Sequence, residues 1–392
     1  MTEIAFPFAD APLLSVVMVT YGGWEWTERA LAALRTHTDA PFEMIVVDNA
    51  SPDGTGERLE RSVRGATVIR NGTNVGFGPA NNQGAAAARG RFLALLNNDA
   101  LVRPGWIGPL VEAAGTPRTG AVVPLLLNLD GTVQEAGSFV YADGSTEAYG
   151  AGAAGSELWC RFPRTTDYGS AACLLIDRSM FLDAGGFDPI FHPAYCEDVD
   201  LQLRLRGRGL RTRFDPRSEV THVRFAASGV SQAETMILRN RRILVDRWVD
   251  VLGLHVPPVD PRHPHRLWAA RDREAVERIL ILGPDQGGLA GELASHYLGG
   301  RVSWLSIGGE PDGRAAALGA EVLSTPADPA RWLRGRRFHY SAVVADPEEY
   351  RRLGSLLDRY QPQAVRIDHG HVDEVIRGLE ESGVVDEAIL SR

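Results

Sequence analysis

The sequence predicts an α/β protein of two units, a large three-layer αβα unit with a mainly parallel central sheet and a smaller C-terminal α/β unit. Apolar, β-branched segments alternate with amphipathic segments along the chain. A proline-rich stretch interrupts this alternation, and 392 residues exceed the roughly 250 to 300 that a single core usually holds. We expect the units to span residues 1–254 and 276–392, joined by a linker at residues 255–275.

A βαβ unit opens the chain. Residues 13–21, LLSVVMVTY, are apolar almost throughout, which is typical of a strand buried on both faces of a parallel sheet. Residues 27–37 place alanine and leucine on one helical stripe, and residues 42–51 again read as a buried strand. Strands joined through a helix in this way run parallel.

The alternation continues to residue 253. We expect strands at residues 66–71, 91–102, 120–128 and 170–177, an alanine-rich helix ending at Arg89, a helix capped by Asp177, an acidic helix start within residues 192–210, an edge strand at residues 211–223 and a long helix at residues 233–253. Polar clusters follow the carboxyl ends of several strands. Ligands bind at that edge of open α/β sheets, because loop amides and helix N-termini converge there.

The linker and the second unit follow. Residues 255–266 hold four prolines and no apolar periodicity, which is typical of a linker. Residues 278–298 then start a new strand, loop and helix, and further strands are expected near residues 302–308, 340–346 and 364–368. The glycine-rich turn at residues 283–288 is too weak a signal to assign a nucleotide site, and a structural or partner-docking role is the simpler interpretation.

Composition excludes several function classes. The formal net charge of −9 and the absence of long basic runs argue against a nucleic-acid partner. All 41 basic residues are arginine, so no lysine is present for a Schiff base, a P-loop or a kinase strand. The three cysteines are too few and too irregularly spaced for a disulfide framework or a zinc site. The excess of arginine, alanine and glycine is typical of a GC-rich bacterial genome.

The N-terminal segment predicts a cytoplasmic protein. Residues 1–12 lack the positive and apolar regions of a signal peptide, and no run of about 18 apolar residues occurs. Association with a membrane surface stays open, because it needs no spanning segment. The oligomeric state is also open.

Five ordered motifs within residues 13 to about 225 resemble the family 2 glycosyltransferases of the Rossmann-like GT-A fold, in particular the rhamnosyltransferase-like branch. The motifs are VVMVTYGGWEWTERALAAL, IVVDNASPDGT, NVGFGPANNQGAAAARGRFLALLNNDALV, GSAACLLIDRSMFLDAGGFDPIF and YCEDVDLQLRLRGRGLRTRFDP. The C-terminal unit lies outside the resemblance. A nucleotide diphosphate sugar is therefore the expected donor.

The resemblance implies where that donor binds. The matching positions are Thr20, Tyr21, Asp48, Gly76, Phe77, Asn81 and Asn98. A carboxylate can accept a hydrogen bond from a pyrimidine N3–H, and a tyrosine ring can stack on a base. Glycine at position 76 permits close backbone approach. The alternative interpretation is that Asp48 and Asn49 only form a turn after a strand.

The segment LLNNDALV matches the metal motif of the family. The resemblance implies Asp99 as the main ligand of Mn²⁺ or Mg²⁺, with Asn97 at the position where the family has a second aspartate. This departure weakens the site, because a neutral amide oxygen is a poorer ligand. His222 matches a histidine that many relatives supply to the metal or the phosphates, and imidazole suits Mn²⁺ better than Mg²⁺. The alternatives are a turn cap for Asp99 and a structural role for His222.

The acidic helix start matches the family's general base. The resemblance implies that Asp198 takes the proton from the acceptor hydroxyl, with Glu197 orienting the loop or binding the acceptor. The helix N-terminus favours ionised Asp198, whereas the charge of Glu197 opposes it. The alternative is that these acids only complement the helix dipole, and Asp200 fits either role.

These inferences predict an inverting glycosyltransferase whose donor is a dTDP- or UDP-linked hexose or deoxyhexose. Its acceptor is a glycan, a lipid-linked glycan or a small natural product. Arg239 and Arg242 could reach the diphosphate, although solvated positions are the simpler interpretation. The alternative function is a nucleotide-sugar binding or scaffold module without catalysis. A dinucleotide-dependent oxidoreductase is disfavoured, because no G-x-G-x-x-G opens the first helix.

Overall fold

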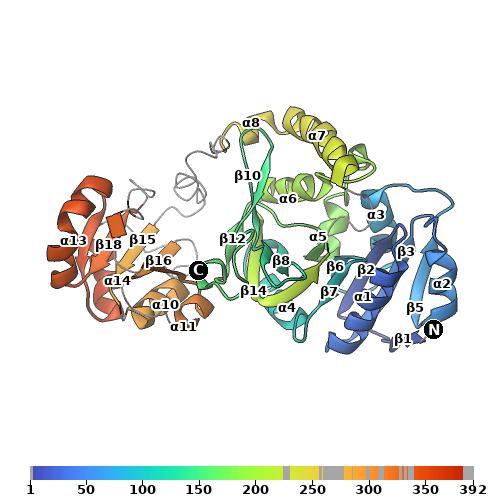
Figure 1. The fold of residues 1–392 in the computed structure, drawn as a ribbon, viewed down its shortest axis with the longest axis horizontal. Coiled ribbons are helices and arrows are strands. Elements are labelled where there is room, and N and C mark those ends of the chain that lie inside the picture. The colour runs from blue at the N-terminus through green and yellow to red at the C-terminus, as the bar shows by residue number, and fades with distance from the viewer. Residues whose placement is uncertain are drawn as a thin grey trace. The chain divides into compact units, whose positions relative to one another are not determined.

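The computed structural model describes residues 3–223, 230–255, 258, 278–284, 286–296, 301–307, 313–325, 329–330, 333 and 340–382 (Figure 1). The chain forms two compact units. The first comprises Met1–Gly155 and Thr165–His255, and the second comprises Ser156–Arg164 and Val256–Arg392. Apart from His255 and Pro258, the predicted linker at residues 255–275 lies outside the described residues.

The first unit is built on a mainly parallel sheet, as predicted. The strand order along its main path is β12-β14-β8-β13-β6-β2-β3-β5. Strand β13 runs antiparallel to β6 and β8, whereas β14 and β8, β6 and β2, β2 and β3, and β3 and β5 pair in parallel. The strands are β2 (Leu14–Thr20), β3 (Phe42–Asp48), β5 (Ala66–Arg70), β6 (Phe92–Asn97), β8 (Thr119–Leu127), β12 (Arg164–Thr166), β13 (Cys173–Asp177) and β14 (Arg211–His222). Off this path, β7 (Ala100–Val102) pairs with β14 and β9 (Val133–Glu135) with β8.

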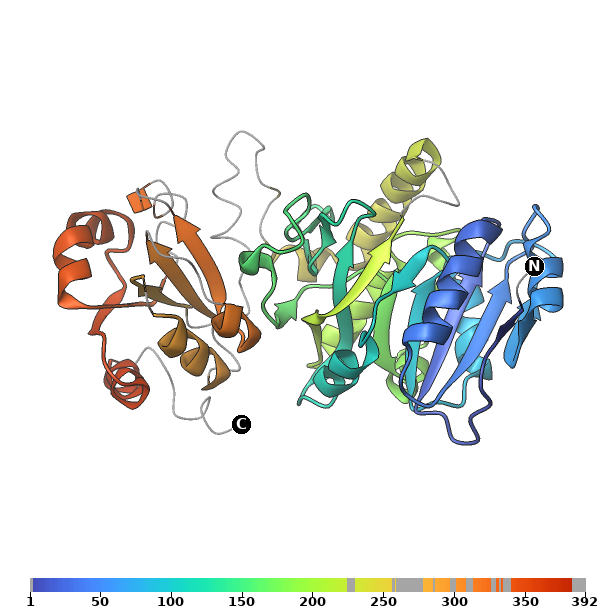
Figure 2. The same cartoon turned by 60° about the horizontal axis from the view of Figure 1, so that its bottom comes forward.

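Helices lie on both faces of this sheet (Figures 1 and 2). Every residue of β2 is buried, as a strand covered on both faces requires. On one face, apolar side chains of α1, α2 and α4 form the largest core cluster of this unit; on the other, Ala80 of α3 packs against Val19 and Val47. The bounds are α1 (Trp24–His37), α2 (Thr55–Ser62), α3 (Phe77–Ala87) and α4 (Ile107–Ala114).

The remaining elements of the first unit surround the ends of the strands. Asp177 caps α5 by accepting from the amides of Ser179 and Met180, as predicted. The other elements are α5 (Arg178–Asp183), η2 (Pro189–Phe191), α6 (Glu197–Gly207), α7 (Val230–Arg247), α8 (Val249–Leu252), β1 (Ile4–Ala5), β4 (Val63–Arg64), β10 (Ser138–Val140) and β11 (Thr146–Ala148). Helices α6, α7 and α8 share a small apolar cluster that includes Val199, Leu244 and Leu252.

The prediction of an edge strand at residues 211–223 is wrong. Strand β14 lies between β8 and the short β12, and it also pairs with β7. The three-residue strand β12 covers the outer edge of β14. The sequence pattern of β14 cannot show that another strand pairs with its outer edge. That strand, β12, ends 45 residues before β14 begins, and its three residues carry no clear strand pattern.

The second unit has a five-stranded, all-parallel sheet in the order β17-β16-β15-β18-β19. Apolar clusters cover both of its faces. Its elements are β15 (Arg278–Leu282), α10 (Gly287–His296), β16 (Arg301–Ile307), α11 (Gly313–Ala317), β17 (Glu321–Thr325), β18 (Ala342–Ala345), α13 (Pro347–Tyr360), β19 (Val365–Asp368) and α14 (Val372–Glu381).

One boundary of the predicted first domain needs correction. We assigned residues 156–164 to that domain, whereas the structure assigns them to the second unit. The segment contains the short helix η1 (Leu158–Cys160), and Leu158 and Trp159 pack against the two apolar clusters of the second unit. Burial of these two large apolar side chains accounts for the assignment.

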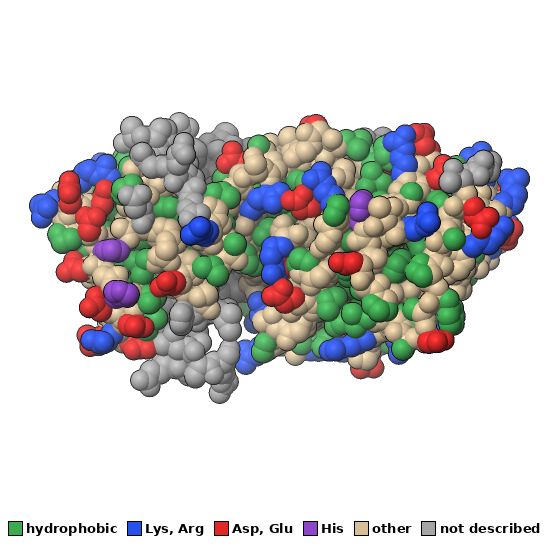
Figure 3. Space-filling model, turned by 90° about the horizontal axis from the view of Figure 1, so that it is seen from below, with side chains coloured by type: hydrophobic (Ala, Val, Ile, Leu, Met, Phe, Trp, Pro, Cys, Tyr) green, Lys and Arg blue, Asp and Glu red, His purple; other side chains and the backbone are tan. Residues whose placement is uncertain are grey.

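Helix composition and surface charge bear on whether the protein binds a membrane or another charged partner. No helix among the described residues is long and apolar enough to cross a membrane. On the face drawn in Figure 3, arginine side chains lie interspersed with aspartate and glutamate side chains.

Candidate active site at the carboxyl ends of the strands

The neighbouring strands β6, β2 and β3 run parallel, so their carboxyl ends meet at one edge of the sheet. Thr20 ends β2, Asp48 ends β3, and Asn97 ends β6. His222 ends β14 and pairs in register with Ala100 of β7, which brings it next to the segment that follows β6. The structure therefore brings together predicted residues that lie up to 202 positions apart.

Asp48 is buried at the end of β3 and is only partly satisfied. Its Oδ1 accepts hydrogen bonds from the Thr20 hydroxyl at 3.3 Å and from the Ser51 amide at 3.2 Å. Its Oδ2 receives no hydrogen bond and lies 3.6 Å from Nε of Arg70. Tyr21, which follows Thr20, is 42% exposed. A buried acceptor oxygen at the end of β3 and an exposed ring directly after the neighbouring strand β2 suit a nucleobase.

Asn49 organises the loop that we expect along the donor. Its Oδ1 accepts from the Val75 amide at 3.0 Å, and its Nδ2 donates to the Gly76 carbonyl at 3.2 Å. Gly76 has φ of +94°, and a Cβ there would lie 2.6 Å from the His192 ring, so only glycine fits. The sequence indicated Asn49 only as a turn former, in the alternative interpretation, because the partners of this side chain lie more than 20 residues away.

Three further donor-site candidates have defined partners. The Phe77 ring packs on Phe187 with centroids 6.0 Å apart. Asn81 is buried and donates to the Phe77 carbonyl at 3.0 Å, so its side chain is used within α3. Asn98 donates to the Gly22 carbonyl at 3.1 Å, which holds the turn after β2. Both amides thus donate to backbone carbonyls, whereas Oδ2 of Asp48 accepts no hydrogen bond from the described residues.

His222 and Asp99 form the candidate metal pair. The His222 Nε2 lies 3.2 Å from Oδ1 of Asp99 and 3.2 Å from Nδ2 of Asn97. The Nδ1 lies 2.6 Å from Oε1 of Gln134, whose own Nε2 donates to the His222 carbonyl. Gln134 therefore favours the hydrogen on Nδ1, so that the Nε2 lone pair accepts from Nδ2 of Asn97 and can turn to a cation beside Asp99.

This arrangement fits a divalent cation. A lone pair and a carboxylate oxygen 3.2 Å apart repel each other unless a proton or a cation lies between them. Beside them, Oδ1 of Asn97 is buried without a hydrogen-bond partner. No three His, Cys, Asp or Glu side chains converge on one point within the part of the chain that the structure describes. Two protein ligands would thus leave positions for oxygen atoms of a substrate.

Asp198 is half-buried in the first turn of α6. Its Oδ2 accepts from the Ala171 amide at 3.2 Å and its Oδ1 from the Val199 amide at 2.9 Å. Burial raises the pKa of Asp198 despite these amides. Burial, and then the charge of Asp198, raises the pKa of Glu197 well above its usual range, and Oε2 of Glu197 has no hydrogen-bond partner. The two acids therefore do not simply complement the helix dipole.

Glu135 is a third buried acid of this region, and sequence analysis missed it. It ends β9, and its Oε1 accepts from the Ser170 amide at 2.8 Å. Burial is the main reason that its pKa rises to about 7, and the charge of Asp198 adds to the rise. No motif marks Glu135 in the sequence, because Ser170, Asp198 and His222, which act on it, lie 35, 63 and 87 residues later.

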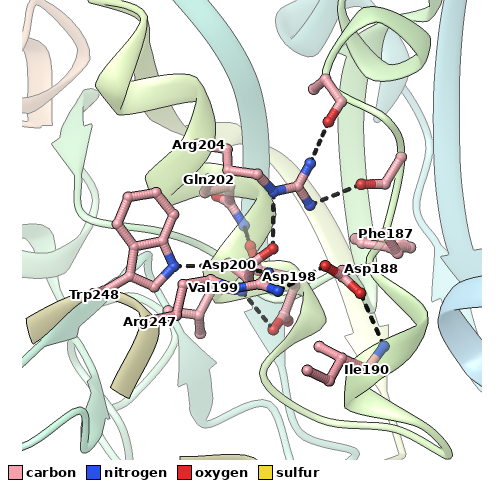
Figure 4. A network of polar contacts seen from close by, with 12 residues as sticks. Phe187, Asp188, Ile190, Asp198, Val199, Asp200, Gln202, Arg204, Arg247 and Trp248 are labelled. Carbon is pink, nitrogen blue, oxygen red and sulfur yellow. Dashed lines mark hydrogen bonds and ion pairs between the residues drawn. The ribbon is translucent and has the colours of Figure 1, made fainter. Parts of the chain in front are cut away.

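Asp200 has a structural role that the sequence left open. It is fully buried and accepts from Nε of Arg204 at 2.8 Å, from Arg247 at 3.0 Å and from the Trp248 indole at 2.9 Å (Figure 4). Arg247 also pairs with Asp188 at 2.8 Å. No dashed line in Figure 4 joins Asp198 to either arginine, so the two aspartates of this helix turn serve different purposes.

Helix α7 holds the loop before α6 as well. The Asn240 amide, fully buried, donates to the carbonyls of Phe191, Ala194 and Tyr195. Arg239 donates to the His192 carbonyl at 2.5 Å. Arg239 is thus occupied by the loop, whereas Arg242 is exposed.

We expect Asp200→Asn to destabilise the protein. Removing a buried charge leaves two arginines without their shared partner, which costs about 3 kcal/mol. Thermal unfolding should show a Tm lower by several degrees, and Asp246→Asn, an exposed acid on α7, is the matched control. An unchanged Tm in Asp200→Asn would show that this network does not stabilise α6.

We also expect the protein without ligand to lose stability as the pH rises from 4.5 to about 7. The folded pKa of Glu135 is about 7, above its usual 4.5, so the folded state binds more protons than the unfolded state in this window. Stability therefore falls with rising pH, and Tm falls by roughly 2–4 °C per kcal/mol lost. Glu135→Gln should flatten the dependence of Tm on pH. An equal slope in the two proteins would contradict the assignment.

Comparison with known proteins identifies the family. The model of "Glycosyl transferase family 2" matches residues 15–146. An N-acetylglucosaminyl-diphospho-decaprenol L-rhamnosyltransferase of Mycobacterium tuberculosis is 31% identical over 255 residues, which cover 58% of this chain and 82% of the relative. This chain belongs to glycosyl transferase family 2. The O-antigen biosynthesis protein RfbC of Myxococcus xanthus is 32% identical to this glycosyltransferase over 240 residues, covering 56% of it and 18% of RfbC.

Solved structures agree on the fold. The crystal structure of GalNAc-T7 with UDP, GalNAc and Mn²⁺ superposes on this glycosyltransferase with a TM-score of 0.50 and 22% identity, covering 61% of this chain and 48% of the other. This likeness confirms the predicted GT-A fold, and the rhamnosyltransferase of Mycobacterium tuberculosis confirms the predicted rhamnosyltransferase-like branch.

Proposed function

We propose that this glycosyltransferase moves a hexose or deoxyhexose from a dTDP- or UDP-linked donor to an acceptor hydroxyl with inversion of configuration. The observation that carries the proposal is the half-buried Asp198, held by the Ala171 amide at the start of α6 close to Glu197 and Glu135, whose pKa values its charge raises. A general base has to lie where an acceptor hydroxyl can reach it, and a raised pKa improves its ability to take a proton.

Asp198 acts late in the reaction in this proposal. A sugar hydroxyl is a far weaker acid than a carboxyl group, so its proton moves only as the new C–O bond forms. Ionised Asp198 accepts that proton while the acceptor oxygen attacks the anomeric carbon from the face opposite the diphosphate. Attack from the opposite face inverts the configuration. Glu197 lies beside Asp198 and binds or orients the acceptor.

Asp99 and His222 would hold Mn²⁺ or Mg²⁺, with Asn97 completing the protein side. The bound cation supplies charge neutralisation for the departing diphosphate. Gln134 keeps His222 in the tautomer that binds a metal, and Asp48 with Tyr21 binds the base. The relative from Mycobacterium tuberculosis and the Mn²⁺ and UDP in the GalNAc-T7 crystal support this choice of chemistry. The name of the first supports a lipid-linked acceptor among the three predicted classes.

Thermal melting with nucleotides tests this function. UDP or dTDP with Mn²⁺ should raise Tm, because a ligand at 100 times its Kd adds about 2.7 kcal/mol to stability. EDTA should reduce this gain, and GDP and NAD serve as controls. Stabilisation by NAD alone would overturn the proposal. Stabilisation by UDP or dTDP without any release of nucleotide from a sugar donor would favour the alternative, a binding or scaffold module.

A further inference from the structure

Glu135 and Asp198 are held by two consecutive amides. The Ser170 amide donates to Oε1 of Glu135 at 2.8 Å, and the Ala171 amide donates to Oδ2 of Asp198 at 3.2 Å. Glu135 comes from β9 and Asp198 from α6, so one short segment aligns two carboxylates from separate elements. They lie close enough for the charge of Asp198 to raise the pKa of Glu135.

Among the described residues, Glu135 forms no ion pair with an arginine or histidine side chain. It is 8% exposed. The titratable groups that interact with it are Asp198 from α6, Tyr168 from the segment before Ser170, and His222 from β14. A buried carboxylate without a cation costs stability, whereas glutamine could keep the Ser170 hydrogen bond without that cost. A structural role alone therefore does not explain a carboxylate here.

A second observation points to a ligand. Glu197, 5% exposed and next to Asp198, has a buried Oε2 without a hydrogen-bond partner. Buried polar atoms are normally hydrogen-bonded, so an oxygen beside these carboxylates that lacks a partner among the described residues can accept from a bound ligand. Hydroxyl groups are the donors that a sugar offers, and a carboxylate accepts from them without changing its own protonation.

We propose that Glu135 is an acceptor-binding residue that accepts a hydrogen bond from a second hydroxyl of a sugar acceptor, adjacent to the hydroxyl that Asp198 deprotonates. The inference rests on the proposed function. Neighbouring hydroxyls of a sugar ring sit on carbons that are joined by one C–C bond. Two carboxylates held by consecutive amides can therefore accept hydrogen bonds from both hydroxyls of such a pair. The acceptor is thus a sugar with a free hydroxyl next to the reacting one.

The test compares parent and deoxy acceptors. Octyl glycosides of hexoses and N-acetylhexosamines are screened with the wild-type protein for transfer, and the best one is compared with its monodeoxy analogues. Glu135→Ala should raise KM for the parent glycoside about 10- to 100-fold, the usual effect of losing a hydrogen bond to a charged group. For the analogue without the neighbouring hydroxyl, the KM of wild type should exceed its KM for the parent glycoside by the same factor. Glu135→Ala should then have the same KM for this analogue as wild type.

Two readouts separate binding from a structural role. The Kd for UDP or dTDP should keep its wild-type value, and Glu135→Gln should not lower Tm at pH 7.5, because a buried charge is removed. Asp130→Asn, which removes an exposed acid from the turn before β9, is the matched control and should keep wild-type KM.

The possible failures are distinguishable. An equal effect of Glu135→Ala on the parent glycoside and on every deoxy analogue, or a lower Tm in Glu135→Gln, would overturn the inference. Donor hydrolysis by wild type without transfer to any glycoside would also overturn it, and would leave the proposed function standing. Failure of wild type to release nucleotide from any sugar donor would instead overturn the proposed function.

Discussion

Asp198→Asn should lower kcat by about 10²- to 10⁴-fold, the usual contribution of a general base. The amide cannot take the acceptor proton, and its NH₂ group would face one of the two backbone amides that now donate to the carboxylate. Binding of UDP or dTDP should persist, since that part of the site lies at the ends of β2 and β3. Turnover with saturating donor and acceptor, together with nucleotide titration, measures both effects.

Two controls make this result specific. Asp183→Asn, an exposed acid at the end of α5, should keep full turnover. The Tm of Asp198→Asn should stay within a few degrees of wild type, because removing a charge that raises the pKa of Glu197 and Glu135 offsets the contact between its NH₂ group and a backbone amide. Full turnover of Asp198→Asn with a verified acceptor would eliminate this residue as the base.

Asp99→Asn should lower transfer by about 100-fold or more, because a cation on the diphosphate contributes several kcal/mol to the transition state. Asn97 already offers an amide, so the substitution would leave no carboxylate among the three candidate ligands. The stabilisation by UDP or dTDP should lose its dependence on Mn²⁺. Transfer rates over a range of Mn²⁺ concentrations and melting curves with and without EDTA measure the two effects.

His222→Gln is the informative companion. It keeps a polar side chain next to Asp99 but removes the nitrogen lone pair that Gln134 orients. We expect a higher Mn²⁺ requirement with partial activity at saturating Mn²⁺. Wild-type dependence on Mn²⁺ in both Asp99→Asn and His222→Gln would place the cation elsewhere.

Local sequence patterns predicted the parts of the site that depend on strand ends. Thr20, Asp48 and Asn97 each end a buried strand, and parallel pairing then places them at one edge whatever the rest of the chain does. The helix start at Glu197 and the cap at Asp177 are equally local features. Such features depend on residues a few positions apart, which is why a sequence reveals them.

The roles of Gln134, Glu135 and Asp200 could not be predicted from local patterns. Gln134 orients His222 across 88 residues, and Glu135 meets Ser170 across 35. The sequence leaves open whether Asp200 complements the helix dipole or belongs to the site. The structure shows that it accepts a hydrogen bond from Arg247, 47 residues later. These roles depend on which segments come together after the sheet has formed, and no spacing rule relates them.

The sequence by itself determined the class of fold, because alternation, strand ends and helix starts follow from short-range backbone chemistry. The resemblance of five ordered motifs then indicated the family and marked the acids at the helix start. Only the tertiary structure showed how the acids of α6 are held. In the described part of the chain, backbone amides donate to Asp198 and no arginine pairs with it, whereas two arginines pair with Asp200. Electrostatic environment is a property of the packed molecule, since desolvation and distant charges act only once the chain has folded.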